Sequence, residues 1–133
     1  MKEKKRPRNK PYFAHDENLE FISLKKECSR IALFISFVKL MKKAGVKDPI
    51  AIAMCDKNDY HIITHNNRDF MYPKTNVKVG IICVGLRNED EWIPRFKKLL
   101  KTFKKHEDFY YKSILIDNGI TIIDRISKDT KYI

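Results

Sequence analysis

The sequence predicts an α/β fold in which helices cover both faces of a largely parallel central sheet. Short apolar runs that are typical of strands alternate with segments of helical periodicity. The run at 78–85, KVGIICVG, is almost continuously apolar, as expected of a strand covered on both faces. Near the end, SILIDNGITIID (113–124) places Asn118-Gly119 between two β-branched runs. We therefore expect a three-layer α/β/α domain with a C-terminal β-hairpin at the sheet edge.

The first elements follow from apolar spacing. A short strand is expected from Tyr12 to His15, and a helix over 22–43 with a break near Ser29 and a stop at Gly45. Asp48-Pro49 then restarts a helix, because Asp caps free amides and Pro is tolerated in the first turn. Its inner face is predicted to hold Ile50, Ala53 and Met54.

The remaining elements have clearer signals. His61 to Thr64 is the second predicted strand and 78–85 the third. A helix is expected to begin between Asn88 and Trp92, with Pro94 in its first turn. One apolar stripe marks its buried side: Trp92, Ile93, Phe96, Leu99, Leu100 and Phe103. Its lysines should face solvent: Lys97, Lys98, Lys101, Lys104 and Lys105. The Asn118-Gly119 turn is expected to need positive φ at both positions.

With 133 residues, the chain is expected to form one domain over 11–133 after a basic flexible leader, 1–10. The leader, MKEKKRPRNK, carries six Lys or Arg and no apolar run, so it is not a secretory signal. It is either a solvated arm or an arm that contacts phosphates. The net charge of +11 favours a polyanionic partner, nucleic acid first.

Two further compositional features bear on location. The longest apolar run, IALFISFV at 31–38, is far shorter than a membrane span, so no membrane association is expected. Cys28, Cys55 and Cys83 are far apart and lie among apolar residues, without the spacing of a zinc site. We interpret them as buried, reduced thiols of a cytoplasmic protein.

Acidic residues follow the predicted strands. Asp16 and Glu17 come after the first strand, and Asn66, Asn67 and Asp69 come after the second. In open α/β sheets the ligand site lies outside the carboxyl ends of the strands. Asp48 begins a crossover helix, whose N-terminus should lie at the same edge. Clustered carboxylates are suited to Mg²⁺ or Mn²⁺, which can activate a water for phosphodiester cleavage.

Simpler roles remain open for each of these residues. Asp48 and Asp16 could be helix caps, and Asp69 could end a turn. Three histidines, His15, His61 and His65, show no pairing with a nucleophile, so core or surface positions are expected for them. Asp56 and Asp59 are expected on a solvated helix end.

The motifs DEN (16–18), KDPIAIA (47–53) and HIITHNNRDF (61–70), in this order, resemble the small PIN-like nuclease domains that open with a strand and a D-E-N triplet. VGIICVGLRNEDEWIPRFKKLL (79–100) and the closing hairpin also look like that family, so the resemblance covers about residues 12–125. It implies a Mg²⁺- or Mn²⁺-dependent ribonuclease, in many cases a VapC-type toxin paired with an antitoxin.

The resemblance also implies residue roles, carried over by matching positions. Asp16, Asp48 and Asp69 match the catalytic, metal-binding acids. Supporting roles fall to three residues, Glu17, Asn67 and Thr64, and RNA contacts to Arg68, Lys47 and Lys10. One departure concerns the acid that PIN domains place in a helix between the first and third acids. Residues 29–47 contain no Asp or Glu, and the nearest substitutes are Glu17, Glu20 and Glu27.

Two functions are therefore expected to compete. The first is a metal-dependent endoribonuclease that cleaves single-stranded RNA, with a cognate antitoxin as a partner. The second is a degenerate module that keeps the fold and binds nucleic acid without catalysis, which the missing acid favours. A homodimer is left open, and exposed apolar surface near the first helices would indicate a protein partner.

Overall fold

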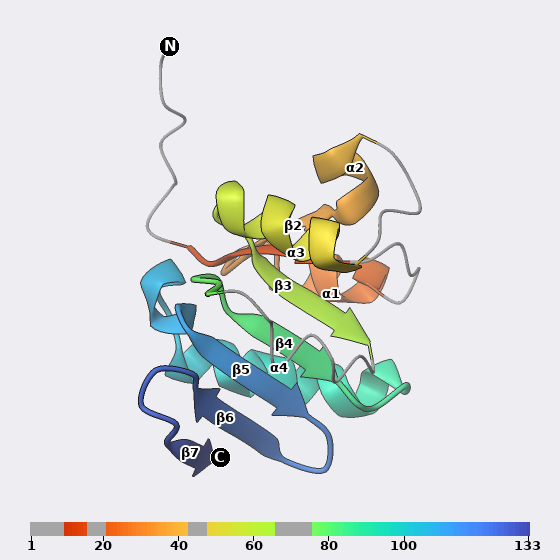
Figure 1. Cartoon of the computed structure of the whole chain (residues 1–133). Coiled ribbons are helices and arrows are strands. Elements are labelled where there is room, and N and C mark those ends of the chain that lie inside the picture. Colours follow the sequence, from red (N-terminus) through yellow and green to blue (C-terminus); the bar gives the residue numbers. More distant parts are fainter. Residues whose placement is uncertain (1–9, 16–20, 43–47, 66–75) are drawn as a thin grey trace.

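Seven strands and four α-helices form the described part of the chain, residues 10–15, 21–42, 48–65 and 76–133, in a computed structural model (Figure 1). The strands are β1 (Tyr12–His15), β2 (Leu33–Ser36), β3 (His61–His65), β4 (Ile81–Val84), β5 (Lys112–Ile116), β6 (Ile120–Asp124) and β7 (Thr130–Tyr132). The helices are α1 (Phe21–Cys28), α2 (Phe37–Met41), α3 (Asp48–Lys57) and α4 (Glu89–Thr102), with a 3₁₀ helix, η3 (His106–Phe109).

All described strands belong to one sheet with the order β2-β1-β3-β4-β5-β6-β7. Neighbouring strands from β2 to β5 are parallel, whereas β6 and β7 are antiparallel to their neighbours. The mostly parallel sheet and the β5-β6 hairpin confirm the prediction. The hairpin is not the outermost element, because β7 pairs with β6 and forms that edge of the sheet.

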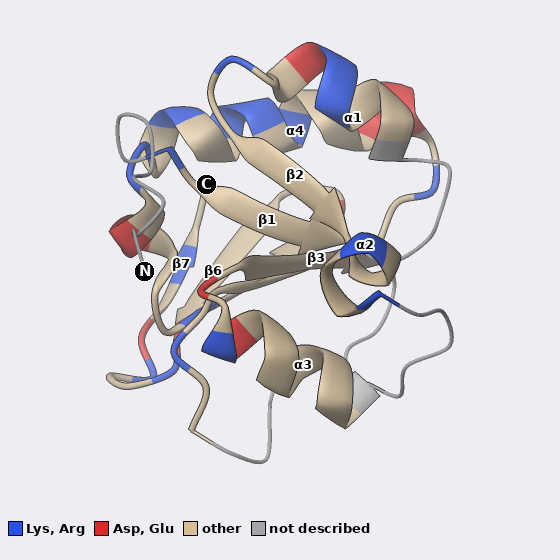
Figure 2. Cartoon of the chain, turned by 90° about the horizontal axis from the view of Figure 1, so that it is seen from above, with Lys and Arg blue, Asp and Glu red and all other residues tan. Residues whose placement is uncertain are grey.

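Helices cover both faces of the sheet, as predicted. Figure 2 shows α1 and α4 side by side on one face and α3 on the other. On the α1/α4 face, Phe13, Phe96 and Trp92 are among the large side chains that are fully buried. On the opposite face, residues of α2 and α3 pack against Ala14, Ile62 and Cys83. The parallel strands therefore bury both of their faces, which explains their continuous apolar runs.

Helix α4 agrees with its predicted stripe. It begins at Glu89 after Asn88, whose side chain accepts a hydrogen bond from the Asp90 amide at 2.9 Å. Residues of the stripe are buried in the described core, with Phe103 partly buried against it. Pro94 is the sixth residue of the helix and so lies in the second turn, not the first. The lysines of this segment are exposed or half-exposed, as expected.

The helix predicted over 22–43 breaks near Ser29 as expected, but the segment that follows the break is a strand and not a helix. Helix α1 ends at Cys28, whose carbonyl accepts the amides of Ile31 and Ala32, and the chain then forms β2 beside β1. An apolar run of this length fits a strand as well as a helix, and pairing with β1 decides for the strand. Only the five residues of α2 then continue as helix. The predicted stop at Gly45 lies outside the described part, since residues 43–47 are not described.

The predicted inner face of α3 is also wrong, although the helix begins at Asp48 as expected. Ala51 and Cys55 are buried, whereas Ile50 is 54% exposed and Ala53 is exposed. The helix is apolar almost all round, so its sequence does not fix its rotation about its axis. Two small residues one turn apart allow α3 to approach the sheet closely.

The closing hairpin forms with a different turn from the one predicted. Ile116 pairs with Ile120, so three residues connect β5 and β6. Neither Asn118 nor Gly119 has the positive φ that a two-residue turn requires. Instead, the Asp117 amide donates to the Gly119 carbonyl and the Asp117 carboxylate accepts the Gly119 amide. A side-chain turn therefore replaces the expected backbone turn.

Candidate site at the carboxyl edge of the sheet

The strand order places a topological switch point between β1 and β3. From β1 the chain crosses to β2 on one side, and later enters β3 on the other side of β1. Crossovers in opposite directions leave a crevice between the two strands at their carboxyl ends, where α/β proteins bind ligands. In this chain His15 ends β1 and His65 ends β3, so the residues that follow them are next in sequence to this crevice.

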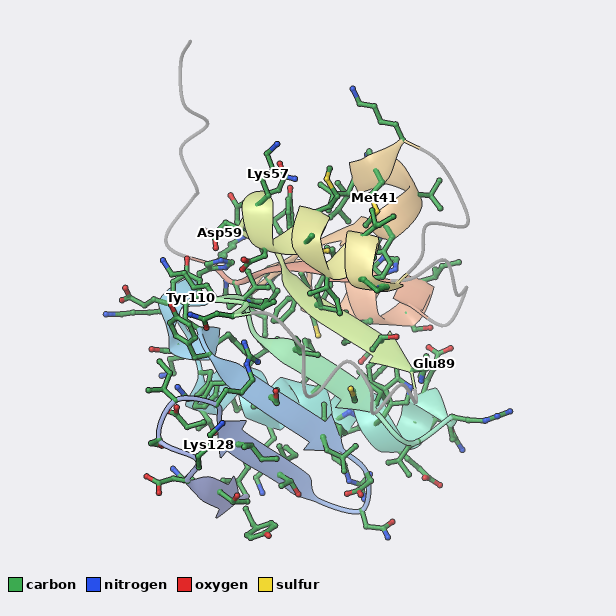
Figure 3. All side chains as sticks on the ribbon, in the orientation of Figure 1. Met41, Lys57, Asp59, Glu89, Tyr110 and Lys128 are labelled. Atoms are coloured by element: carbon green, nitrogen blue, oxygen red, sulfur yellow. The ribbon has the colours of Figure 1, made fainter. Side chains whose placement is uncertain are left out.

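On the α1/α4 face, side chains from three elements approach this edge. The register of β1 against β3 pairs His15 with Ile63. His65 packs edge-on against Trp92 of α4, with ring centroids 5.5 Å apart. Glu89 precedes Trp92 by three residues and therefore lies on the same side of α4. Figure 3 shows Glu89 at the end of β3.

Glu89 carries the clearest sign of a ligand-binding role. Its Oε2 atom is buried and has no hydrogen-bond partner among the described residues. Leaving a buried carboxylate oxygen unpaired is costly, and an ion or an ordered water is the usual remedy. Glu89 is also the acid that opens the helix after β4, so it belongs to the same edge by topology.

Sequence reasoning missed Glu89, which falls within the predicted helix start between Asn88 and Trp92 and is the first residue of α4. The signal that could have identified it is its place directly after a buried parallel strand, the criterion already applied to Asp16 and Asp69. Its neighbours Asp90 and Glu91 are exposed, which distinguishes Glu89 as the inward-facing acid.

On the opposite face, Thr64 and the start of α3 occupy the same edge. Thr64 is 3% exposed and pairs in register with Cys83 of β4. Helix α3, which begins at Asp48, runs back along the sheet, so the start of the helix lies on the side where β3 ends. The backbone thus places two of the residues implied by the resemblance at one edge.

The other implied residues lie outside the described part or elsewhere. Six of them lie outside the described part: Asp16, Glu17, Lys47, Asn67, Arg68 and Asp69. Lys10 is described, but it precedes β1 and so lies at the amino edge, a strand length away from the carboxyl ends. Among the residues the structure describes, no group of three or more His, Cys, Asp or Glu is placed to hold a metal ion.

A second polar cluster occupies the amino edge of the sheet, opposite Glu89 (Figure 3). The His61 and His106 rings stack with centroids 4.0 Å apart. Nδ1 of His61 accepts the Gly80 amide at 2.8 Å, and its Nε2 donates to the His106 carbonyl at 2.7 Å. Nδ1 of His106 accepts the Tyr12 amide at 3.0 Å. Both rings are buried and held by these bonds, so His61 occupies one of the two positions expected for it, the core.

Asp59 completes this cluster and is not on a solvated helix end as predicted. Its carboxylate accepts the Tyr110 hydroxyl at 2.8 Å and the His106 Nε2–H at 3.1 Å. Asp56 likewise accepts the backbone amides of Lys78 and Val79. Both acids therefore tie α3 and the turn after it to later segments of the chain.

The cysteines have the environment that was predicted. Cys28, Cys55 and Cys83 are free and buried. Burial raises the pKa of the Cys28 thiol to about 11, and burial together with the nearby Asp56 charge raises that of Cys55 to about 12. Both thiols therefore stay protonated near neutral pH and are poor nucleophiles or metal ligands.

Fold and site together define an open α/β protein with polar groups gathered at the carboxyl edge of its parallel strands. No helix of the described residues has the length and apolar character needed to cross a membrane. Comparison of the chain with protein-family models, with curated proteins and with solved structures gave no match.

Proposed function

We propose that the chain is a metal-dependent endoribonuclease of the PIN-like type that cleaves single-stranded RNA. The observation that carries the proposal is the adjacency of β1 and β3 at the switch point. Asp16 is next in sequence to the end of β1, and the run from Asn66 to Asp69 is next to the end of β3. Two candidate acids thus follow neighbouring strands in the place where α/β proteins bind ligands.

The residues at this edge suit a hard divalent cation. The buried, unpartnered Oε2 of Glu89 is an oxygen donor of the kind that Mg²⁺ and Mn²⁺ prefer. Asp16, Asp48 and Asp69 would complete the set, with Glu17, Asn67 and Thr64 in support. Glu89 supplies a carboxylate that the PIN resemblance does not assign, in a chain that lacks the middle acid. A bound ion would supply Lewis-acid chemistry at the scissile phosphate.

The substrate follows from charge. With +11 net charge, the chain favours a phosphate backbone over a neutral or cationic substrate. Arg68 and Lys47 would hold that backbone near the acids. Single-stranded RNA fits best, because a flexible strand can enter the crevice at the end of a sheet without melting a duplex.

Substituting the acids tests the proposal. Asp16→Asn and Asp69→Asn should each abolish Mn²⁺-dependent cleavage of RNA, and Glu89→Gln should reduce it by roughly a hundredfold or more. Melting temperatures should stay near that of the wild type. Asp90→Asn is the matched control, because Asp90 is exposed and lies beside Glu89 in the same helix turn. This variant should cleave RNA at the wild-type rate. Cleavage that persists in both the Asp16 and the Asp69 variants would exclude this site.

A non-catalytic RNA-binding module is the second candidate. The lack of Asp and Glu between residues 29 and 47 favours it, as do the asparagines at positions 66 and 67. Calorimetric titration with Mn²⁺ separates the two functions. No Mn²⁺ binding together with salt-sensitive RNA binding would favour the module, whereas Mn²⁺ binding that Glu89→Gln weakens would favour the nuclease.

Exposed apolar side chains support the proposal of a protein partner, such as an antitoxin. Ile22 of α1 is 63% exposed, and Ile31 and Leu33 at the outer strand β2 are 47% and 41% exposed. The four apolar residues of α2 are only half-buried. Apolar groups at an open sheet edge favour association with another chain.

A further inference from the structure

The exposed side of α4 changes sign along its length. Its first turn carries Glu89, Asp90 and Glu91 at the carboxyl edge of the sheet. Its second half and the residues after it carry lysines at steps of one, three and four residues, toward the amino edge. We call four of them the α4 lysine face: Lys98, Lys101, Lys104 and Lys105. Figure 2 shows this change from red to blue along α4.

The α4 lysine face has no charge partner in the described part of the chain. Lys97 differs, because its Nζ forms an ion pair with Glu27 of α1 at 2.7 Å. The four lysines of the face are exposed, and their ammonium groups form no ion pair with any described residue. Only Lys101 lies in the last turn of α4, where it stabilises the helix dipole, so the dipole does not account for the other three lysines. Their mutual repulsion favours an external anion.

The chemistry of this surface favours a phosphate backbone. A membrane-binding helix needs apolar side chains among its basic ones, but the apolar residues of α4 are buried against the sheet. A protein interface has an apolar or aromatic centre and few lysines, and no large apolar side chain of α4 is exposed. Repeated unpaired ammonium groups without apolar neighbours match a chain of evenly spaced phosphates.

We propose that the α4 lysine face binds the backbone of single-stranded RNA at a site separate from the carboxyl edge. The inference rests on the proposed function for the choice of RNA. Helix α4 has 14 residues and is therefore ~21 Å long, and the lysine face occupies its second half and the residues that follow it. RNA held by the lysines would extend along α4 toward the candidate site.

Binding without metal tests the inference independently of cleavage. We would measure fluorescence anisotropy of a labelled oligouridylate of about 20 nucleotides in EDTA over a range of salt concentrations. Lys98→Glu, Lys101→Glu and Lys105→Glu combined should weaken binding roughly tenfold or more. They should also lower the slope of log affinity against log salt by about 2, because each single-strand phosphate contact contributes about 0.7. The control combines Lys39→Glu, Lys57→Glu and Lys131→Glu, which change the net charge equally at exposed positions of other elements.

The outcomes separate this inference from the proposed nuclease. Equal weakening by the two triple variants, or a triple Lys→Gln variant at the same α4 positions that binds like the wild type, would overturn the α4 site. The Gln variant also guards against misfolding, as does a circular dichroism melt. Binding to phosphatidylserine vesicles but not to RNA would overturn it too. If the face binds RNA but no metal-dependent cleavage occurs, only the nuclease proposal fails.

Discussion

Arg125 joins segments of the chain that are far apart in sequence. One terminal nitrogen of its guanidinium donates to the Lys112 carbonyl and the Ser113 hydroxyl, at 2.6 and 3.0 Å. The other donates to the carbonyls of Val77 and Val79 at 2.8 and 2.7 Å. Burial lowers the pKa of this arginine below its ordinary value. The planar fork therefore joins the segment before β4 to the start of β5.

Arg125→Lys should lower the free energy of unfolding by about 3 kcal/mol, because one ammonium cannot reach both pairs of acceptors and buried carbonyls would lose their donors. Urea denaturation measures the change. Arg87→Lys provides the control, since Arg87 is exposed and should lose less than about 0.5 kcal/mol. Similar losses in the two variants would show that the fork contributes little.

At the scale of single residues, the sequence predicted which residues are buried better than it predicted which residues bond to each other. Burial of the three cysteines could be predicted from their apolar neighbours. The roles of Arg125 and Asp59 could not, because their partners are contributed by segments distant in sequence. Glu89 was within reach of prediction, since its position after a buried strand is visible in the sequence, but its buried oxygen is a property of the folded chain.

At the scale of elements, Gly80, which directly precedes β4, packs closely against η3. A Cβ atom at Gly80 would lie 2.5 Å from the Phe109 carbonyl oxygen and 3.0 Å from the Phe109 Cβ. The Gly80 amide also donates to His61, and its carbonyl accepts the Ile62 amide. Gly80 can therefore move only by disturbing both β3 and η3.

Gly80→Ala should destabilise the fold by about 1–3 kcal/mol, because η3 must shift to admit the methyl group. Gly119→Ala is the matched control. Its added Cβ would meet its nearest atom, the Ile133 carbonyl oxygen, at 3.8 Å, and its backbone needs no positive φ. Thermal and urea unfolding of both variants would provide the comparison. A loss at Gly119 as large as that at Gly80 would contradict the packing argument.

Prediction of elements succeeded where periodicity was unambiguous and failed where it was not. The stripe of α4 and the flanks of the β5-β6 hairpin each fit one structure only. The run at 31–38 fits either a helix or a strand, and pairing with β1, formed far from it in sequence, made it β2. Strand β7 has only three residues, all exposed, and no apolar pattern that could have predicted it.

At the scale of the whole molecule, the fold class followed from the alternation of strands and helices, but the strand order did not. The missed strand β2 lies beside β1, and its presence creates the switch point between β1 and β3. The sequence predicted that the acids share one edge of the sheet, because residues that follow parallel strands lie at the carboxyl ends of those strands. The observed strand order narrows the expected position of the site to the switch point between β1 and β3.

The stability of the whole molecule should decrease at alkaline pH because of its buried thiols. Burial raises the pKa of Cys55 from 9.0 to about 12, so below pH 9 the thiol is protonated in both the folded and the unfolded chain. Above pH 9 the unfolded chain releases a proton that the folded chain retains. The stabilisation is therefore full below pH 9 and is lost as pH rises toward 12.

The free energy of unfolding attributable to Cys55 should fall by up to about 1.4 kcal/mol per pH unit above pH 9. Comparing Cys55→Ala with the wild type at each pH isolates this contribution, because lysines and tyrosines titrate equally in both. The variant should be less stable than the wild type at pH 7, and the difference should shrink as pH approaches 11. Urea denaturation at several pH values between these limits measures it. A difference that is independent of pH would mean that the folded chain also ionises this thiol near pH 9, and that α3 does not shield it from water.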